Sequence, residues 1–344
     1  MVKWNLDFFR KQVDVFTMQK KGIGNSHAKI ILMGEHSVVY GQPAIALPLP
    51  NVTTKVVMIG NDNHEQIIES RYFSGPVAQL PQAMSGIAKL IKELVTHFAG
   101  QADGWTMKIT SDIPAERGMG SSAACAVAII RAMFDFYNQS LDRQSLLRWA
   151  DVEEKVTHRS PSGLDAATVS SANPVWFKKG AKGTPISLNL EATMVIADTG
   201  IKGATREAIQ TVKDKLQHQP RATQQLINKL GQLTKESRDA VANNQANQLG
   251  EKLTAAHHAL DQLGVSDPKL NQLVTTALAN HALGAKLTGG GRGGCMVAIT
   301  KSALGARKIA SILKEHGAVA TWIQPFNKGV TSWKQVHGHI QILP

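Results

Sequence analysis

The stretch from Ile113 to Ala124, with the sequence IPAERGMGSSAA, constrains the fold more than any other part of the chain. It follows an alternating, strand-like segment and precedes an apolar segment that predicts a buried helix over Gly120–Tyr137. Gly118 and Gly120 let the backbone approach a ligand and adopt positive φ without steric cost. A helix that begins near Ser121 turns unpaired N–H groups and the positive end of its dipole toward this loop. The stretch therefore predicts a phosphate-binding loop.

The serines at the start of this helix add hydroxyl groups to the same loop. Ser121 and Ser122 follow the last glycine directly, and one of them is positioned to bind Mg²⁺. The alternative interpretation is an ordinary helix start whose small residues permit tight packing. The Walker pattern GxxxxGK[ST] is absent from the chain, so this is not a P-loop enzyme.

Two acidic residues flank a second turn. Glu154 lies near the end of a predicted helix over Leu141–Thr157, and Asp165 follows a Pro-Ser-Gly turn. Such a turn could bring the two acids together, and in a kinase one acid would hold the metal while the other faces the acceptor hydroxyl. In the alternative, Glu154 is a solvated helix charge and Asp165 caps the next segment.

Two further stretches place unusual residues beside strands. Residues 287–295, LTGGGRGGC, predict a hinge or phosphate-facing loop, or else a tight bulged turn, because so many glycines lower stability unless the backbone passes close to something. Residues 29–41, KIILMGEHSVVYG, could present an ammonium, a carboxylate and an imidazole together. Each of these three groups could equally be a surface or capping residue.

The order of the predicted elements indicates an α+β protein, because strands and helices mix without a regular βαβ alternation. Its 344 residues suit about two domains, and we place the boundary near residue 185. Predicted strands and helices are Lys29–Met33, Val38–Leu47 and Val52–Ile59 (strands), Pro81–Phe98 (helix), Trp105–Thr110 (strand), short strands within 174–196, helices through 202–282, Met296–Thr300 (strand), Ser302–His316 (helix) and two strands up to Leu343.

The composition restricts the partners only loosely. The net charge of +12 favours polyanions, but the Lys and Arg residues are scattered and only three Tyr accompany them, so nucleic acid is not expected. No stretch of about 18 uninterrupted apolar residues predicts a membrane span. The first 22 residues lack the pattern of a signal peptide, so we expect a cytoplasmic protein.

The four stretches, in this order, resemble the GHMP superfamily of small-molecule kinases, which groups galactokinase, homoserine kinase, mevalonate kinase and phosphomevalonate kinase. The resemblance covers residues 23–300. It implies a two-domain α+β GHMP kinase fold: an extension over 1–22, a nucleotide-binding half similar to ribosomal protein S5 domain 2 over 23–185, and an α/β sandwich-like half over 186–344. Dimers are common in this family, so a homodimer is compatible with the resemblance.

Within the superfamily the chain looks most like the mevalonate kinases. Residues 29–41 are similar to their KVILxGEHAVVxG pattern, whereas a galactokinase would follow Gly-Glu-His with Thr-Asp-Tyr. Three places depart from the pattern: His27-Ala28 replaces Pro-Gly, and both Glu116-Arg117 and Arg292 bring charge into loops that small residues usually line. The implied reaction is γ-phosphoryl transfer from MgATP to the C5 hydroxyl of (R)-mevalonate.

The resemblance also implies roles for individual residues. Asp165 would accept or orient the proton of the acceptor hydroxyl, and Lys29 would lie beside Asp165 and the γ-phosphate. Ser122 and Glu154 would bind Mg²⁺. The substrate side would include Glu35, His36 and Thr205. The ATP phosphates would lie against Pro114, Ala115, Glu116, Arg117, Gly118, Met119, Gly120, Ser121, Ser122, Ala123 and Ala124.

Something basic should also hold the mevalonate carboxylate, and Arg159 is our hypothesis for this cation. Two rival functions remain. A sister kinase for another hydroxylated acid would share every residue above except the pocket lining. A nucleic-acid-binding protein with an S5-like half would show salt-dependent binding and no ATP turnover.

Overall fold

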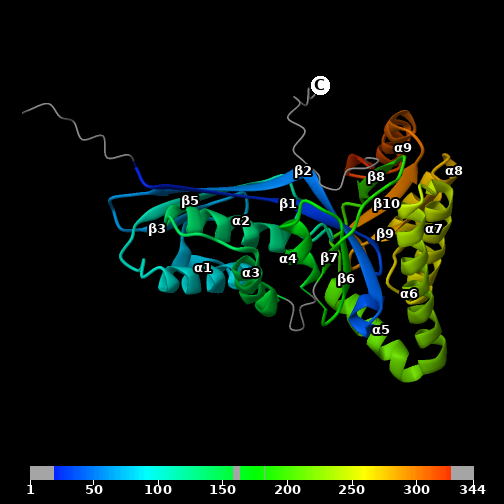
Figure 1. Ribbon diagram of the computed structural model, residues 1–344, viewed down its shortest axis with the longest axis horizontal. Coiled ribbons are helices and arrows are strands. Elements are labelled where there is room, and N and C mark those ends of the chain that lie inside the picture. Colours follow the sequence, from blue (N-terminus) through cyan, green and yellow to red (C-terminus); the bar gives the residue numbers. More distant parts are fainter. Residues whose placement is uncertain (1–18, 158–162, 182, 327–344) are drawn as a thin grey trace, which may run out of the picture.

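The computed structural model describes residues 19–157, 163–181 and 183–326, which form two sheets with helices packed on them (Figure 1). The N-terminal half contains a seven-stranded sheet of order β4-β3-β5-β2-β6-β7, with β1 paired to β2 off this path. Among the described strands of this sheet, only β3 and β5 pair in parallel. The strands are β1 (Lys21–Met33), β2 (Pro43–Gly60), β3 (Gln66–Glu69), β4 (Ser74–Pro76), β5 (Trp105–Ser111), β6 (Val175–Lys178) and β7 (Thr184–Pro185).

Helices cover one face of this sheet (Figure 1). The apolar helix α2 packs directly on β1 and β2, while α1 and α3 pack on α2 and on each other. All-round burial of α2 follows from its Ala- and Ile-rich sequence, and the predicted helix is confirmed. The helices of this half are α1 (Ser85–His97), α2 (Ser121–Phe136), α3 (Arg143–Thr157) and the short α4 (Leu164–Val169).

The first two strands differ from the prediction in length. β1 begins eight residues earlier than expected, because Gly22 and Gly24 give its backbone room against α2; a Cβ at Gly24 would lie 1.9 Å from the carbonyl oxygen of Ala128. β2 joins two predicted segments into one long strand. The predicted strand start at Val38 is wrong: the 3₁₀ turn η1 (Ser37–Tyr40) stands there, and Gly41 ends it with φ 81°.

The C-terminal half contains a four-stranded antiparallel sheet of order β11-β8-β10-β9. Helices α7 and α8 pack on β9, whereas α9 packs on β8 and β11. The helical prediction for 202–282 is confirmed, but β9 was not predicted, because its end overlaps the residues of the predicted glycine-rich loop. The elements are β8 (Ala192–Asp198), α5 (Thr205–His218), α6 (Pro220–Ala242), α7 (Ala246–Gln262), α8 (Pro268–Ala279), β9 (Gly284–Thr288), β10 (Cys295–Thr300), α9 (Ala303–Glu315) and β11 (Ala320–Phe326).

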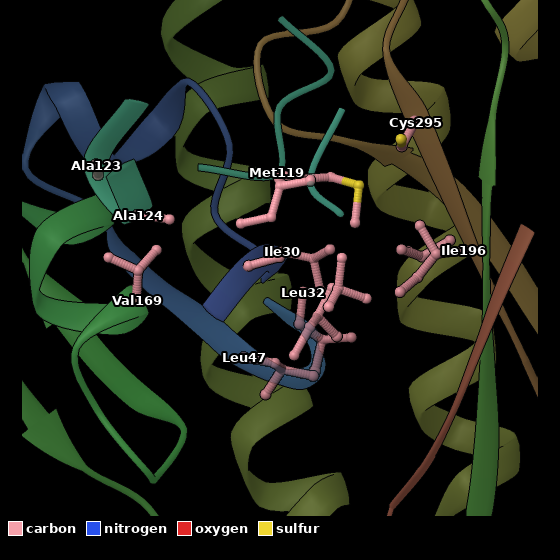
Figure 2. Close-up of a cluster of buried hydrophobic side chains, with 14 of the residues drawn as sticks. Ile30, Leu32, Leu47, Met119, Ala123, Ala124, Val169, Ile196 and Cys295 are labelled. Carbon is pink, nitrogen blue, oxygen red and sulfur yellow. The ribbon is translucent and has the colours of Figure 1, made fainter. Parts of the chain in front are cut away.

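One hydrophobic core crosses the junction of the two halves. Figure 2 shows the Met119 side chain between Ala124 and Val169 of the N-terminal half and Ile196 of β8. Met119 is fully buried, so the loop that contains it is anchored on both sides. Burial of a Met side chain contributes roughly 1.5–3 kcal/mol to folding.

The change from the first sheet to the second falls between β7 and β8. A division near residue 185 stays our proposal, as does an N-terminal extension, although Lys21 and Gly22 of the proposed range 1–22 are the first residues of β1. The second of the two strands predicted near the C-terminus lies outside the described residues, as do residues 1–18. Among the described helices, none has the length and apolarity needed to cross a membrane.

Candidate active site

Two glycine-bearing loops meet where the halves join. The phosphate loop, residues 114–124, passes so close to the glycine-rich loop, residues 289–294, that a Cβ on Gly289 would lie 2.8 Å from Cα of Gly118. Both glycines have φ near +78°, a region that side chains other than glycine rarely adopt. In the described part of the chain no side chain caps the start of α2, so its first N–H groups have no side-chain acceptor there.

Lys29 and Asp165 form an ion pair beside the phosphate loop. Lys29 Nζ lies 3.0 Å from Asp165 Oδ1. The backbone N–H of Lys29 donates to the carbonyl of Met119 (3.0 Å), and the Lys29 stem packs against Gly120. Asp165 lies in the first turn of α4, two residues after Gly163. The structure thus brings together an ammonium, a carboxylate and the start of α2.

Glu154 lies near Asp165, as the spacing of the motif predicts. Its side chain is 5% exposed, and its Oε1 accepts a hydrogen bond from the N–H of Gly163 at 3.3 Å. Burial, followed by repulsion from Asp165, raises the pKa of Glu154 to about 7. A cation bound beside the buried Glu154 carboxylate would offset this repulsion from Asp165.

Ser122 does not bond to Glu154. Its hydroxyl donates instead to the carboxylate of Glu153, the preceding residue of α3. The sequence motif did not indicate Glu153, because an acidic pair near a helix end is typical of a solvated surface. Glu153 is nevertheless only 2% exposed.

Comparisons with known proteins agree with this arrangement. Residues 85–172 match the model of the GHMP kinases N terminal domain, and residues 237–319 match that of the GHMP kinases C terminal region. The mevalonate kinase of Pyrococcus abyssi is 31% identical over 322 residues, which span 87% of this chain and 94% of that protein. The chain belongs to the mevalonate kinase family of the GHMP kinases.

Solved structures of this family share the fold. The L. major mevalonate kinase, whose crystal structure is a complex with R-mevalonate, has a TM-score of 0.78 and 26% identity over 90% of this chain and 98% of its own. The mevalonate kinase of methicillin-resistant Staphylococcus aureus MRSA252 has a TM-score of 0.69 and 31% identity over 89% and 99%. The predicted two-domain GHMP kinase fold is therefore confirmed.

The substrate-side residues proposed from the family motif gather around Gly290. A ring nitrogen of His36, Nε2, lies 2.9 Å from the carbonyl oxygen of Gly290. Thr205, the first residue of α5, packs so tightly on Gly290 that a Cβ there would lie 2.0 Å from Thr205 Oγ1. Burial lowers the pKa of His36 to about 4, so its imidazole is neutral at pH 7.

Glu35 forms a buried ion pair that the family motif did not indicate. Its Oε1 accepts a hydrogen bond from Nζ of Lys286 in β9, and both side chains are fully buried. Glu35 Oε2 has no hydrogen-bond partner among the described residues. Burial lowers the pKa of Lys286 and raises that of Glu35, while their mutual attraction opposes both shifts. The sequence signal that could have indicated this pair is Lys286 itself, a lysine in an otherwise apolar strand.

The charges that depart from the family pattern hold the two loops in place. Arg117 pairs with Asp198 at the end of β8 (2.9 Å) and donates to the carbonyl of Gly200. Glu116 pairs with Lys202 at an exposed position (2.6 Å). Arg292 donates from its guanidinium to the hydroxyl of Thr211 (2.7 Å) in α5. Arg117 and Arg292 thus bond to residues outside the two loops, whereas the Glu116 pair lies at the surface.

Arg159, our hypothesis for a carboxylate-binding cation, lies outside the described residues, as do Pro161 and Ser162 of the acidic turn.

Proposed function

We propose that the protein transfers the γ-phosphoryl group of ATP to the C5 hydroxyl of (R)-mevalonate, giving 5-phosphomevalonate and ADP. The Lys29–Asp165 pair carries this proposal, because it puts a proton acceptor and a cation beside the start of α2. Membership of the mevalonate kinase family supports mevalonate as the acceptor.

The ATP phosphates bind, in this proposal, to residues 114–124. The uncapped N–H groups at the start of α2 and the helix dipole attract the phosphate charge. The close approach of Gly118 and Gly289 puts two backbone segments without side chains at this junction, which suits a long polyanion. The 16-residue length of α2 and its burial keep these N–H groups rigid.

The donor atoms around Glu154 fit Mg²⁺. Hard oxygen ligands are what this ion prefers, and it usually takes one or two from the protein and the rest from phosphates and water. Glu154 supplies a buried carboxylate whose charge is uncompensated beside Asp165, and Ser122 supplies a hydroxyl. When bound, Mg²⁺ would neutralise charge on the β- and γ-phosphates.

Asp165 and Lys29 act on the acceptor side. Asp165 accepts a hydrogen bond from the C5 hydroxyl and takes its proton as the new O–P bond forms and the γ-phosphate leaves ADP. Lys29 stabilises the charge that spreads over the transferring group. Because phosphoryl transfer has a loose transition state, orientation and electrostatics contribute most of the rate.

The remaining oxygen of Glu35 is a candidate partner for a substrate hydroxyl. It is buried, lacks a partner among the described residues, and lies at the junction near Lys29, whose charge acts on it. A buried acceptor without a donor costs about 1–3 kcal/mol, which a bound hydroxyl would recover. The apolar Val38, also buried, cannot pair with a sugar hydroxyl.

An ADP-release assay with mevalonate, phosphomevalonate, galactose and homoserine tests the proposal. We expect mevalonate to be preferred over galactose and homoserine by at least about 10³ in kcat/KM, because sites selected by hydrogen bonds reject unmatched substrates on that scale. Phosphomevalonate is excluded because its C5 oxygen is already phosphorylated. Equal turnover of any of these with mevalonate would leave a kinase whose substrate is not mevalonate. A cytoplasmic location and a homodimer stay predictions.

A further inference from the structure

Glu153 is a buried carboxylate that family motifs do not assign a role. Its Oε1 accepts hydrogen bonds from two hydroxyls, that of Ser122 at the start of α2 and that of Thr157 at the end of α3, the latter at 2.5 Å. A buried carboxylate is costly unless such donors satisfy it. Glu153 therefore ties the helix that bears the phosphate loop to the helix that bears Glu154.

The surroundings of Glu153 are closely packed. A Cβ on Gly86, at the start of α1, would lie 3.0 Å from Glu153 Oε1 and 2.9 Å from Thr157 Oγ1. The thiol of Cys125, one turn after Ser122, has its pKa raised to about 12 by burial and by the Glu153 charge. The carboxylate is thus held on several sides, and its orientation is set by the fold.

The two adjacent acids of α3 face different groups. Glu154 accepts from the N–H of Gly163 and lies near Asp165, whereas Glu153 accepts from Ser122. A serine hydroxyl has one proton and two lone pairs. Because the proton goes to Glu153, the lone pairs of Ser122 remain free, and a charged acceptor makes its oxygen a stronger ligand.

We propose that Glu153 is a positioning residue that holds the Ser122 hydroxyl with its lone pairs free for the metal of MgATP. This inference rests on the proposed function. Partners that orient a metal ligand typically change metal affinity or activity by 10- to 100-fold when they are mutated. Glu153 touches neither the substrate nor the phosphates; it acts through Ser122.

The test combines Glu153→Gln, Ser122→Ala and the double variant, with Thr157→Val as the matched control. Binding of a non-hydrolysable ATP analogue is measured by calorimetry at a series of Mg²⁺ concentrations, and the Mg²⁺ dependence of kcat is measured in parallel. We expect Glu153→Gln to raise the half-saturating Mg²⁺ concentration about 10-fold or more, with little change in metal-free nucleotide binding. Thr157→Val, which removes the other donor to Glu153, should shift the half-saturating Mg²⁺ concentration by less than about threefold.

The double variant distinguishes positioning from a separate role. If Glu153 acts through Ser122, the double variant should bind Mg²⁺ no more weakly than Ser122→Ala alone. Both substitutions then remove the same interaction, that of the Ser122 hydroxyl with the metal, so their effects do not add. Additive losses, or an unshifted Mg²⁺ dependence in Glu153→Gln, would overturn the proposal. Glu153→Asp is the second variant if Gln fails to fold: it keeps the charge, shortens the reach and should shift Mg²⁺ dependence in the same direction.

The wild-type enzyme separates this proposal from the proposed function. If it does not phosphorylate mevalonate but its Mg²⁺-dependent nucleotide binding still requires Glu153, only the choice of acceptor has failed. If it phosphorylates mevalonate and Glu153→Gln shows wild-type Mg²⁺ dependence, only the positioning role has failed.

Discussion

Lys29 Nζ lies 3.0 Å from Asp165 Oδ1, and the lysine side chain is 3% exposed while that of the aspartate is 30% exposed. The lysine is thus enclosed by protein, and the carboxylate remains open on the side where an acceptor would bind. This difference in exposure suits a proton acceptor that is open to the substrate and is held in place by a buried cation.

Asp165→Asn should abolish most turnover and leave ATP binding intact, because the carboxylate faces the acceptor and not the nucleotide. Loss of a general base lowers rates by about 10²- to 10⁴-fold. Turnover is measured by ADP release and nucleotide affinity by calorimetry. A kcat within about threefold of wild type would contradict the role that we assign to Asp165.

Glu154→Gln should raise the Mg²⁺ concentration for half-maximal rate, since it removes an anionic oxygen from the metal. The metal-free pKa of Glu154 is raised to about 7, so below pH 7 a proton competes with Mg²⁺ for this carboxylate. In the wild type, half-saturating Mg²⁺ should therefore rise as pH falls from 8 to 6, by up to about tenfold per pH unit below the pKa.

Glu154→Gln is the control for this pH effect in the wild type. ATP titrates equally in both measurements, but the variant lacks the Glu154 carboxyl group. Its Mg²⁺ dependence should change less with pH than that of the wild type. Parallel curves for the two proteins would show that Glu154 does not hold the metal.

The sequence predicts the parts of this site that lie in contiguous motifs. Lys29 and Asp165 each stand beside a recognisable glycine turn, so their roles followed from pattern and resemblance. The roles of Lys286 and Glu153 could not be predicted in this way. A charged residue in a strand or helix looks solvated until the distant segment that buries it is known. Lys286 meets Glu35, 251 positions away, and Glu153 meets Ser122, 31 positions away. Pairings of this kind belong to the tertiary structure.

Packing against a distant segment also explains why β1 begins earlier than predicted. Gly22 and Gly24 weaken a strand pattern in isolation, yet α2 lies so close to them that a side chain would not fit. The start of β1 was therefore not predicted, because the glycines that allow the strand to pack on α2 are residues that weaken a strand pattern.

Lys286→Met should strongly destabilise the protein, because it leaves the Glu35 carboxylate buried without its counter-charge. Breaking a buried pair by removing one partner typically costs about 3–5 kcal/mol, whereas replacing both partners is often nearly neutral. The double variant Lys286→Met with Glu35→Gln should therefore recover much of the free energy of unfolding, measured with urea. Equal stability of Lys286→Met and wild type would contradict an ion pair here.

A chain that begins at Met18 should fold and keep full activity, whereas one that begins at Ile23 should melt at a lower temperature. The amide of Gln19 donates to the carbonyl of Gly60 (2.6 Å), and the N–H of Gly60 donates to the carbonyl of Lys20 (2.8 Å). The shorter chain loses these contacts and the first residues of β1. Thermal unfolding of both chains beside the full-length protein measures the difference, and inactivity of the Met18 chain would show that residues 1–17 belong to the enzyme.

His257 should make the protein lose stability in acid. Its side chain is 5% exposed, and its Nδ1 accepts a hydrogen bond from the N–H of Leu287 at 3.3 Å, next to Lys286. Burial, followed by the charge of Lys286, lowers the pKa of His257 to about 4 from an ordinary 6.5. At His257 the unfolded chain therefore binds more protons between these values, so the contribution of His257 to stability is constant above pH 6.5 and falls as pH drops toward 4.

The expected loss from His257 alone is about 3 kcal/mol over that window, from 1.36 kcal/mol per pKa unit. His257→Asn keeps an acceptor for Leu287 and has no titrating ring, so its stability should fall less steeply in acid. His36, with a pKa also lowered to about 4, and Glu154, whose raised pKa works in the opposite direction, remain in both proteins. The difference between the two urea-unfolding curves from pH 7 to pH 4 thus isolates His257, and a difference that does not change with pH would mean that the pKa of this imidazole is the same in the folded and the unfolded protein.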